Sequence, residues 1–288
     1  MAVNFCYASS EEELMNTGSK NLTGTQLIRS LLLFFGSFMF AFILNSYIIH
    51  EAGHAFGGML FGCKIKSLII NPFGTGSWDS QCPFMTLKGK VVQGMGGPIF
   101  GLPISIAITL LLWRKRRPVL LPLLMSAPVV CIANFLGVLD SMLNYPGHIF
   151  DYGWMLLIGV TPFFVRVIGI ISLVIGIILM NLLLPLAGIE ITEPFWKVLL
   201  LNLSTWPLYL LIRLFYQVSE GVDSAGPMSF FILGGILAIF TALPFRPILK
   251  FASRFTKTEP VIPSTRVAWL VFGLGMGLTV GLTLLNPF

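Results

Sequence analysis

The chain has 288 residues, of which 56% are hydrophobic and only 10% are charged, and its mean hydropathy is +0.88. A soluble domain is typically about 45–50% apolar and about 25% charged. The chain lacks the polar surface that a soluble enzyme needs, so a soluble enzyme is excluded. In lipid the structural unit is a spanning helix of about 20 apolar residues. We therefore expect an all-α polytopic membrane protein in a lipid bilayer.

The net charge of +6 results from 18 Lys and Arg residues against 12 Asp and Glu residues. The cations form short clusters between apolar runs, and the densest cluster is 114–117. These clusters lack the interleaved aromatic residues that bind single-stranded nucleic acid. Positive clusters of this kind orient helices by the positive-inside rule. We expect no nucleic-acid partner, an inside N-terminus and a location in the cell (inner) membrane.

Residues 1–26 form a polar segment without the pattern of a secretory signal peptide. About seven apolar runs follow, each long enough for one spanning helix. We expect the fourth run to be one bent span, because Pro162 and Arg166 interrupt it. The predicted spans, in chain order, are 30–49 with an extension to 62, 94–113, 118–139, 154–186, 195–216, 228–248 and 268–285.

The loop between the first two spans, 63–93, contains a segment of β-type composition at 65–70, followed by turn residues. This pattern predicts a short β-hairpin or a re-entrant loop. Cys63 and Cys82 bracket the loop, without the spacing of a zinc ribbon. We expect these cysteines to be packing residues, with a disulfide between them as the alternative.

At the end of the first span the run His50-Glu51-Ala52-Gly53-His54 places two histidines four residues apart. On a helix both imidazoles lie on one face, one turn apart, and Glu51 lies beside them. This is the H-E-x-x-H arrangement of zinc hydrolases, in which the histidines bind Zn2+ and the glutamate is the general base. Ionisable residues are costly inside a membrane span, so their presence here favours a functional site.

A hydrolytic zinc ion has three protein ligands and one open position. The third ligand must come from another segment, and the polar residues that follow the third span are candidates. These residues leave three alternatives, Asp140, His148 and Asp151.

The first span also carries a family resemblance. Residues 50–55, followed by 60–65, resemble the first core helix of the site-2 protease family of intramembrane zinc metalloproteases. Gly96-Gly97-Pro98 is similar to the small-residue motif on the next core helix of that family. The resemblance covers roughly residues 40–160.

The segment after the third span resembles the N-x-x-P…D-G motif of the same family, through Asn144, Pro146, Asp151 and Gly153. This chain departs from the motif in two spacings. Asn144 and Pro146 are two residues apart rather than three, and Tyr152 separates Asp151 from Gly153, whereas the motif has the aspartate and the glycine adjacent. The resemblance implies that Asp151 is the third zinc ligand, with His148 and Asp140 as the alternatives.

The resemblance implies an intramembrane zinc endopeptidase that cleaves membrane-anchored protein substrates, with a three-span catalytic core over 27–160 that includes the loop 63–93. Additional transmembrane helices occupy 161–288, where we assign no motif. Two other functions are compatible with the same residues. One is a transporter or metal-binding membrane protein on the same scaffold, and the other is a zinc hydrolase of a non-peptide substrate. Glu51 favours hydrolysis, because a site that only binds metal has no use for a general base.

Several side chains have supporting roles in this hypothesis. Asn134 and Asn144 are candidate donors to the oxyanion that forms during hydrolysis. Asn45, Ser46 or a backbone carbonyl can accept the second N–H of a ligating histidine. The segment 64–70 offers a strand edge for an unwound substrate. Glycines on the first two spans are expected to bring their backbones close together.

Overall fold

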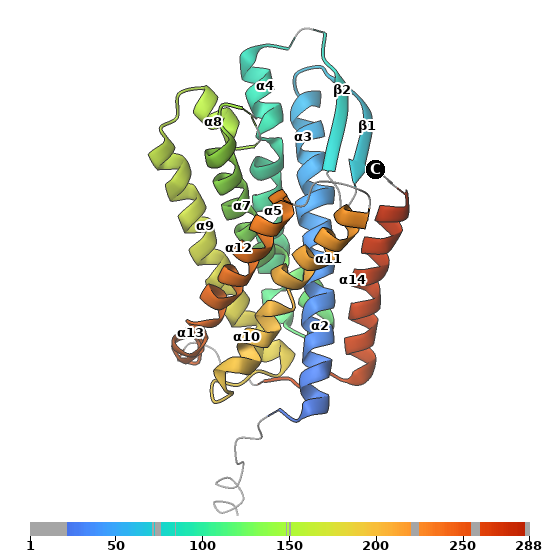
Figure 1. The fold of residues 1–288 in the computed structure, drawn as a ribbon, viewed down its shortest axis with the longest axis vertical. Coiled ribbons are helices and arrows are strands. Elements are labelled where there is room, and N and C mark those ends of the chain that lie inside the picture. Colours follow the sequence, from blue (N-terminus) through green and yellow to red (C-terminus); the bar gives the residue numbers. More distant parts are fainter. Residues whose placement is uncertain are drawn as a thin grey trace, which may run out of the picture.

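The computed structural model describes residues 22–70, 72, 76–83, 85–147, 149, 151–219, 225–254 and 260–285. The chain is a bundle of helices with one small two-stranded sheet at one end (Figure 1). Among the described residues six helices are long and apolar enough to cross a membrane, or seven if one bent pair is a single span. The prediction of a mostly helical, multi-pass chain is confirmed at this level. The polar segment 1–26 lies mostly outside the described residues.

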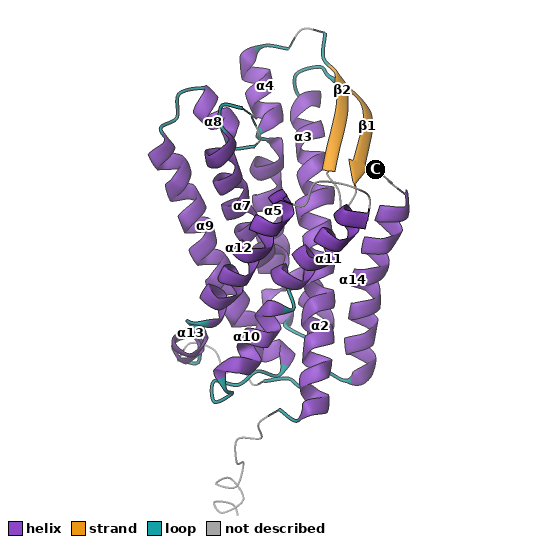
Figure 2. Cartoon of the chain, viewed as in Figure 1, coloured by secondary structure: helices purple, strands orange, loops and turns teal. Residues whose placement is uncertain are grey.

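Figure 2 shows that helices make up most of the described chain. The elements are, in chain order, α2 (Gly24–Phe42), the π-helix η1 (Ile43–Ile49), α3 (His50–Met59), β1 (Lys64–Ile70), β2 (Gly76–Gln81), α4 (Leu87–Gly94), α5 (Gly96–Leu112), η2 (Trp113–Lys115), η3 (Pro118–Leu120), α6 (Leu121–Leu124), α7 (Ser126–Asn144), α8 (Gly153–Leu157), α9 (Pro162–Leu183), η4 (Leu184–Ala187), α10 (Phe195–Leu203), α11 (Trp206–Ser219), α12 (Ala225–Ala242), α13 (Phe245–Ala252) and α14 (Thr265–Leu285).

The first span is a continuous helix of 36 residues, made of α2, η1 and α3. It begins at a capping box, in which Thr23 accepts from the backbone N–H of Gln26 and the Gln26 side chain accepts from the backbone N–H of Thr23. The π-helix lies directly before His50, and such turns are frequent at functional sites. The helix packs against α14, α6, α7 and α10, so it forms the centre of the bundle.

The start of this helix is fixed by a buried ion pair on the second half of the chain. Glu193 accepts the backbone N–H of Leu22 at 2.7 Å and the ammonium group of Lys197 at 2.7 Å. Lys197 also donates to the carbonyl of Leu22 at 2.9 Å. A buried charge is tolerated only when it is paired and hydrogen-bonded, and here each charged group has two partners.

Helix α3 approaches α4 and α5 through glycines. A Cβ atom on Gly53 would collide with the carbonyl group of Gly96, and a Cβ atom on Gly57 would lie 2.8 Å from the carbonyl oxygen of Val92. Such close approach of backbones requires small residues at the interface. The expected role of these glycines in tight packing is confirmed.

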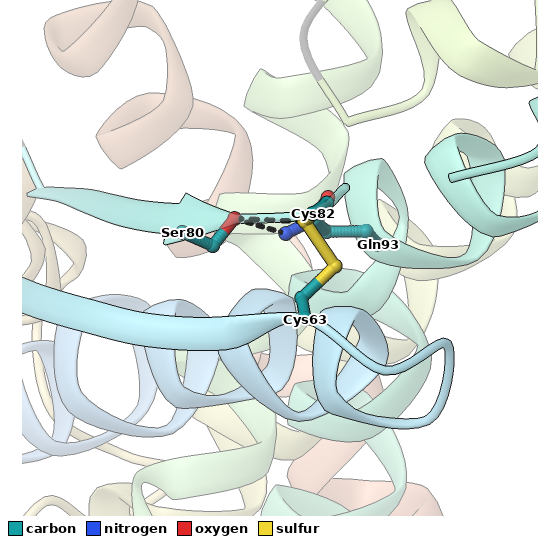
Figure 3. The surroundings of a disulfide bond; sticks show 4 residues. All are labelled: Cys63, Ser80, Cys82 and Gln93. Carbon is teal, nitrogen blue, oxygen red and sulfur yellow. Dashed lines mark hydrogen bonds between the residues drawn. A yellow bond between two sulfur atoms is a disulfide. The ribbon is translucent and has the colours of Figure 1, made fainter. Parts of the chain in front are cut away.

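The predicted hairpin is present, as β1 pairs antiparallel with β2 beside α3. The expectation that Cys63 and Cys82 do not pair is wrong, because they form a disulfide at the base of the hairpin (Figure 3). The strand register explains why this disulfide forms. Lys64 pairs with Gln81, so the two flanking cysteines are brought to a Cα–Cα distance of 4.4 Å.

Two predicted spans have different boundaries in the structure. The fourth is not one bent helix from residue 154, because α8 ends at Leu157 and α9 begins at Pro162. Gly159 between them has a φ of +88°, which a helix cannot contain. The sixth span is broken after α12, and the helical segments on either side of the break differ in direction by 41°. Pro244 lies at this break and explains it, because a proline ring is incompatible with a continuing helix.

Candidate metal centre

His50 and His54 lie on one face of α3, one turn apart, as the spacing predicts. The planes of their imidazole rings make an angle of 79°, and the ring centroids are 4.7 Å apart. The Nε2 atoms of the two rings are 3.1 Å apart. The two nitrogen ligands that the motif predicts therefore point to a common position.

Asp151 meets both histidines from a different part of the chain. Its Oδ1 atom is 3.4 Å from Nε2 of His50 and 3.2 Å from Nε2 of His54. The other carboxylate oxygen faces α7, where it would lie 3.7 Å from a Cβ atom on Gly137. Asp151 thus connects the turn before α8 to the motif helix.

The backbone of Asp151 has a φ of +23°, in the left-handed region that non-glycine residues rarely adopt. Aspartate tolerates this region better than most residues do. The backbone carbonyl of Asp151 accepts the N–H of Trp154 at 3.2 Å, which ties the turn to α8. Unusual backbone geometry of this kind is concentrated at functional sites.

These three side chains form a group that can hold a metal ion, with one ligand atom from each residue. The side chains of His50, His54 and Asp151 are 19%, 8% and 22% exposed. The centre is therefore enclosed by the protein but is not sealed from the surroundings, as a site that admits a substrate requires.

The imidazole of His54 is oriented by a backbone carbonyl. Its Nδ1 atom is 2.8 Å from the carbonyl oxygen of Gln93, and since that oxygen can only accept, Nδ1 carries the proton. The backbone N–H of Gly97 is also near Nδ1, but at the longer distance of 3.4 Å. A proton on Nδ1 leaves the lone pair of Nε2 directed at the centre, as a metal ligand requires.

Of the three proposed acceptors for this N–H, the backbone carbonyl is therefore the one found at His54. Asn45 is committed elsewhere, because its amide donates to the carbonyl of Ala41 at 2.7 Å and its oxygen accepts from Ser105 at 2.7 Å. The hydroxyl of Ser46 is buried and has no hydrogen-bond partner among the described residues.

Glu51 lies beside the three candidate ligands and is 8% exposed. Its carboxylate interacts electrostatically with His50, His54 and Asp151. A carboxylate in this position can exchange a proton with a group bound at the centre, which is the role that the motif predicts for it.

Two ionisable groups next to the centre have altered pKa values. Burial raises the pKa of Asp151, but the neighbouring imidazoles of His50 and His54 lower it by more, so the net pKa is well below its usual range. Burial and the nearby Asp151 carboxylate raise the pKa of the Tyr152 hydroxyl. Asp151 is therefore an anion and Tyr152 is neutral at physiological pH.

The other predicted site residues are not among the three candidate ligands, and one lies outside the described residues. Asp140 accepts a hydrogen bond from Asn144 at 2.7 Å, and this exposed pair does not belong to the three-residue group. His148 lies outside the described residues. Asn134 is buried on α7, and its Nδ2 atom has no hydrogen-bond partner within the described part of the chain.

The sequence did not indicate the role of Gln93, which links the centre to the hairpin. Its backbone carbonyl accepts from His54, while its side chain donates to the hydroxyl of Ser80 at 3.0 Å. Ser80 in turn lies 3.3 Å from the sulfur of Cys82, and Figure 3 shows these groups beside the disulfide. The sequence does not indicate such a contact, because every residue has a backbone carbonyl.

The hairpin is also held at its turn. The carbonyl oxygen of Pro72 accepts from the hydroxyl of Tyr209 at 2.6 Å and from that of Tyr47 at 3.1 Å. Tyr47 lies on η1, directly before the motif, and Tyr209 lies on α11. The helices beyond residue 160 thus help to position the hairpin beside the centre.

Comparison of the chain with protein-family models, with curated proteins and with solved structures finds no match.

Proposed function

We propose that the chain is an intramembrane zinc endopeptidase that hydrolyses peptide bonds of membrane-anchored protein substrates. The observation that carries this proposal is a cluster of three candidate metal ligands beside Glu51. His50 and His54 lie on a helix long and apolar enough to span a membrane, and Asp151 meets them from the turn before α8. The three residues of this cluster all belong to the motifs that resemble the site-2 protease family.

The donor set fits zinc in number, chemistry and spacing. Two imidazoles and one carboxylate are a common ligand set of hydrolytic zinc sites. Tetrahedral ligands about 2.0–2.2 Å from a zinc ion lie about 3.4 Å from one another. The three ligand atoms here are 3.1, 3.2 and 3.4 Å apart. When bound, zinc would lower the pKa of a water molecule and polarise the scissile carbonyl.

The side chains of the chain itself supply proton transfer and orientation. Glu51 accepts the proton of the attacking water and returns it to the leaving amine. Asn134 has a buried N–H group without a partner among the described residues, and such a group is available to stabilise an oxyanion. Asn144 is less suited to this role, because its amide already donates to Asp140.

A peptide bond in a helix is hydrogen-bonded within that helix, so an intramembrane protease must bind an unwound stretch of its substrate. Within the described residues strand β1 pairs with β2 alone, and its residues Leu68 and Ile69 are 38% and 42% exposed. An extended substrate can add to such an edge as a further strand. We propose this as the mode of substrate binding, in a multi-pass protein of the inner membrane.

The variant Glu51→Gln tests the proposal, with Glu190→Gln as a control that removes a carboxylate remote from the centre. We expect the purified wild type to cleave members of a panel of single-span substrates, with the cut bonds identified by sequencing of the products. Glu51→Gln should keep bound zinc and lose cleavage, whereas Glu190→Gln should retain both.

Two results would contradict the proposal. Unchanged cleavage by Glu51→Gln would remove the general base from the mechanism. A wild type that binds zinc but hydrolyses none of the substrates would instead favour a metal-binding or transport protein, or a hydrolase of a non-peptide substrate.

A further inference from the structure

A groove that none of the candidate metal ligands lines is present elsewhere in the bundle. It has a volume of about 580 Å3 and lies between η2, α9 and α13. Figure 1 shows α13 at the end of the bundle where α2 begins, whereas the hairpin is at the opposite end. The apolar side chains that line it include Trp113, Ile178, Leu182 and Phe251.

Arg116 is the one charged side chain among the described residues that line this groove. Its guanidinium group lies over the ring of Trp113, 4.8 Å from the ring centroid, and burial lowers its pKa. The ion pairs within the described part of the chain join Asp151 to two histidines and Glu193 to Lys197, so Arg116 has no carboxylate partner there. A guanidinium group that lines an apolar groove and has no carboxylate beside it is suited to pair with an anionic group of a ligand.

Helix α13, which lines the groove through Pro247, Ile248 and Phe251, also carries basic residues on another face. Its residues Phe245 and Leu249 are buried, whereas Arg246 and Lys250 are exposed on the same helix, followed by the exposed Arg254. A short amphipathic helix with basic residues on its polar face lies at the interface of a membrane and is attracted to anionic lipids.

We propose that this groove binds an anionic glycerophospholipid, with an acyl chain between α9 and α13 and the phosphate group at Arg116. The lining matches a ligand with one long apolar part and one negative charge. The volume lies within the range of about 300–1,000 Å3 that is typical of ligand sites. Basic pockets between transmembrane helices are known binding sites for anionic lipid headgroups. This proposal does not depend on the proposed protease activity.

The charge requirement is tested with the full-length protein in detergent, by titration with phosphatidylglycerol and with phosphatidylcholine of the same acyl chains. We expect the wild type to bind phosphatidylglycerol about fivefold more tightly, or better, which is the effect of one cation near a lipid phosphate. Arg116→Gln should abolish this preference. Arg114→Gln, an exposed member of the same basic cluster that does not line the groove, should retain it.

The groove itself is tested with Leu182→Trp, which fills the space between α9 and α13. We expect this variant to lose affinity for both lipids. Retained preference for phosphatidylglycerol in Arg116→Gln or in Leu182→Trp would overturn the proposal, because it would indicate general surface electrostatics.

A second measurement on the wild type does not depend on the folding of any variant. A phosphatidylglycerol with a photoreactive acyl chain should cross-link to α9 and α13, as mapped by mass spectrometry of the peptides. Cross-links confined to other helices would overturn the proposal.

Discussion

The backbone of Gly97 lies against the imidazole ring of His50, and no side chain fits between them. A Cβ atom on Gly97 would lie 2.6 Å from Nδ1 of His50, closer than real Cβ contacts. His50 is therefore fixed on one side by a backbone, while its Nε2 atom faces His54 and Asp151. This contact gives a physical reason for glycine in the Gly96-Gly97-Pro98 segment.

Gly97→Ala should displace the His50 ring and weaken metal binding. The added methyl group must move either the ring or the backbone of α5, and overpacking of this kind costs about 1–3 kcal/mol. A misplaced ligand should lower zinc affinity about 10- to 100-fold, the effect of losing a group that orients a ligand. Competition titration with a chelating dye measures the affinity.

Gly101→Ala is the matched control on the same helix, because a Cβ atom on Gly101 would have no heavy atom closer than 4.0 Å. It should leave the zinc affinity unchanged. Equal affinities for the two variants would contradict the proposed contact.

Asp151→Asn should lose most of the bound zinc, since an amide oxygen replaces the anionic ligand. Asp140→Asn is the matched control, because Asp140 is paired with Asn144 outside the three-residue group. Elemental analysis of the purified variants distinguishes them. Full zinc content in Asp151→Asn, together with loss in Asp140→Asn or in His148→Ala, would transfer the third-ligand role to the affected residue.

Reduction of the Cys63–Cys82 disulfide should loosen the hairpin and weaken the metal centre. A disulfide that closes a loop of this length contributes about 3 kcal/mol to stability in the chain-entropy model. The contacts from Cys82 through Ser80 to Gln93 extend to His54, so reduction should also lower zinc affinity. Hydrogen exchange of residues 64–70 and a zinc titration follow the two effects.

The double variant Cys63→Ala/Cys82→Ala is the control for this experiment. A reductant should change neither its hydrogen exchange nor its zinc affinity, because the remaining described cysteine, Cys131, is not in a disulfide. A response of the double variant equal to that of the wild type would show that reduction acts elsewhere.

Tyr209→Phe should release part of the hairpin turn from α11 while the aromatic packing of the ring is kept. It removes the hydrogen bond to the carbonyl of Pro72 and the contact with the hydroxyl of Tyr47, and within the described part of the chain Tyr47 remains as a donor to that carbonyl. The net loss should be about 0.5–1.5 kcal/mol, seen as faster hydrogen exchange in β1. Tyr145→Phe, on an exposed tyrosine, should have no such effect, and identical exchange in the two variants would contradict the anchoring role.

Much of the fold was predictable from the sequence, because helices in lipid must be long and apolar, and this chain contains such runs at clear intervals. The hairpin followed from β-type composition next to turn residues. The breaks near Gly159 and Pro244 were missed, since an apolar run continues through each of them and hydropathy does not show a change in direction.

The candidate site was predictable where a side chain is the ligand. His50 and His54 followed from helical spacing, and Asp151 followed from the family resemblance. The support given by the carbonyl of Gln93 was not predictable, because any residue has a carbonyl. The disulfide was missed because it depends on the strand register, which places Cys63 opposite Cys82 and which spacing in the sequence does not reveal.

The central claim is that His50, His54 and Asp151 form one metal centre, and the metal content of the purified protein tests it most directly. After incubation with zinc and removal of excess metal, the wild type should contain one zinc ion per chain by elemental analysis, and His54→Ala should contain almost none. A wild type without bound zinc, or a His54→Ala variant with the same zinc content as the wild type, would contradict the account.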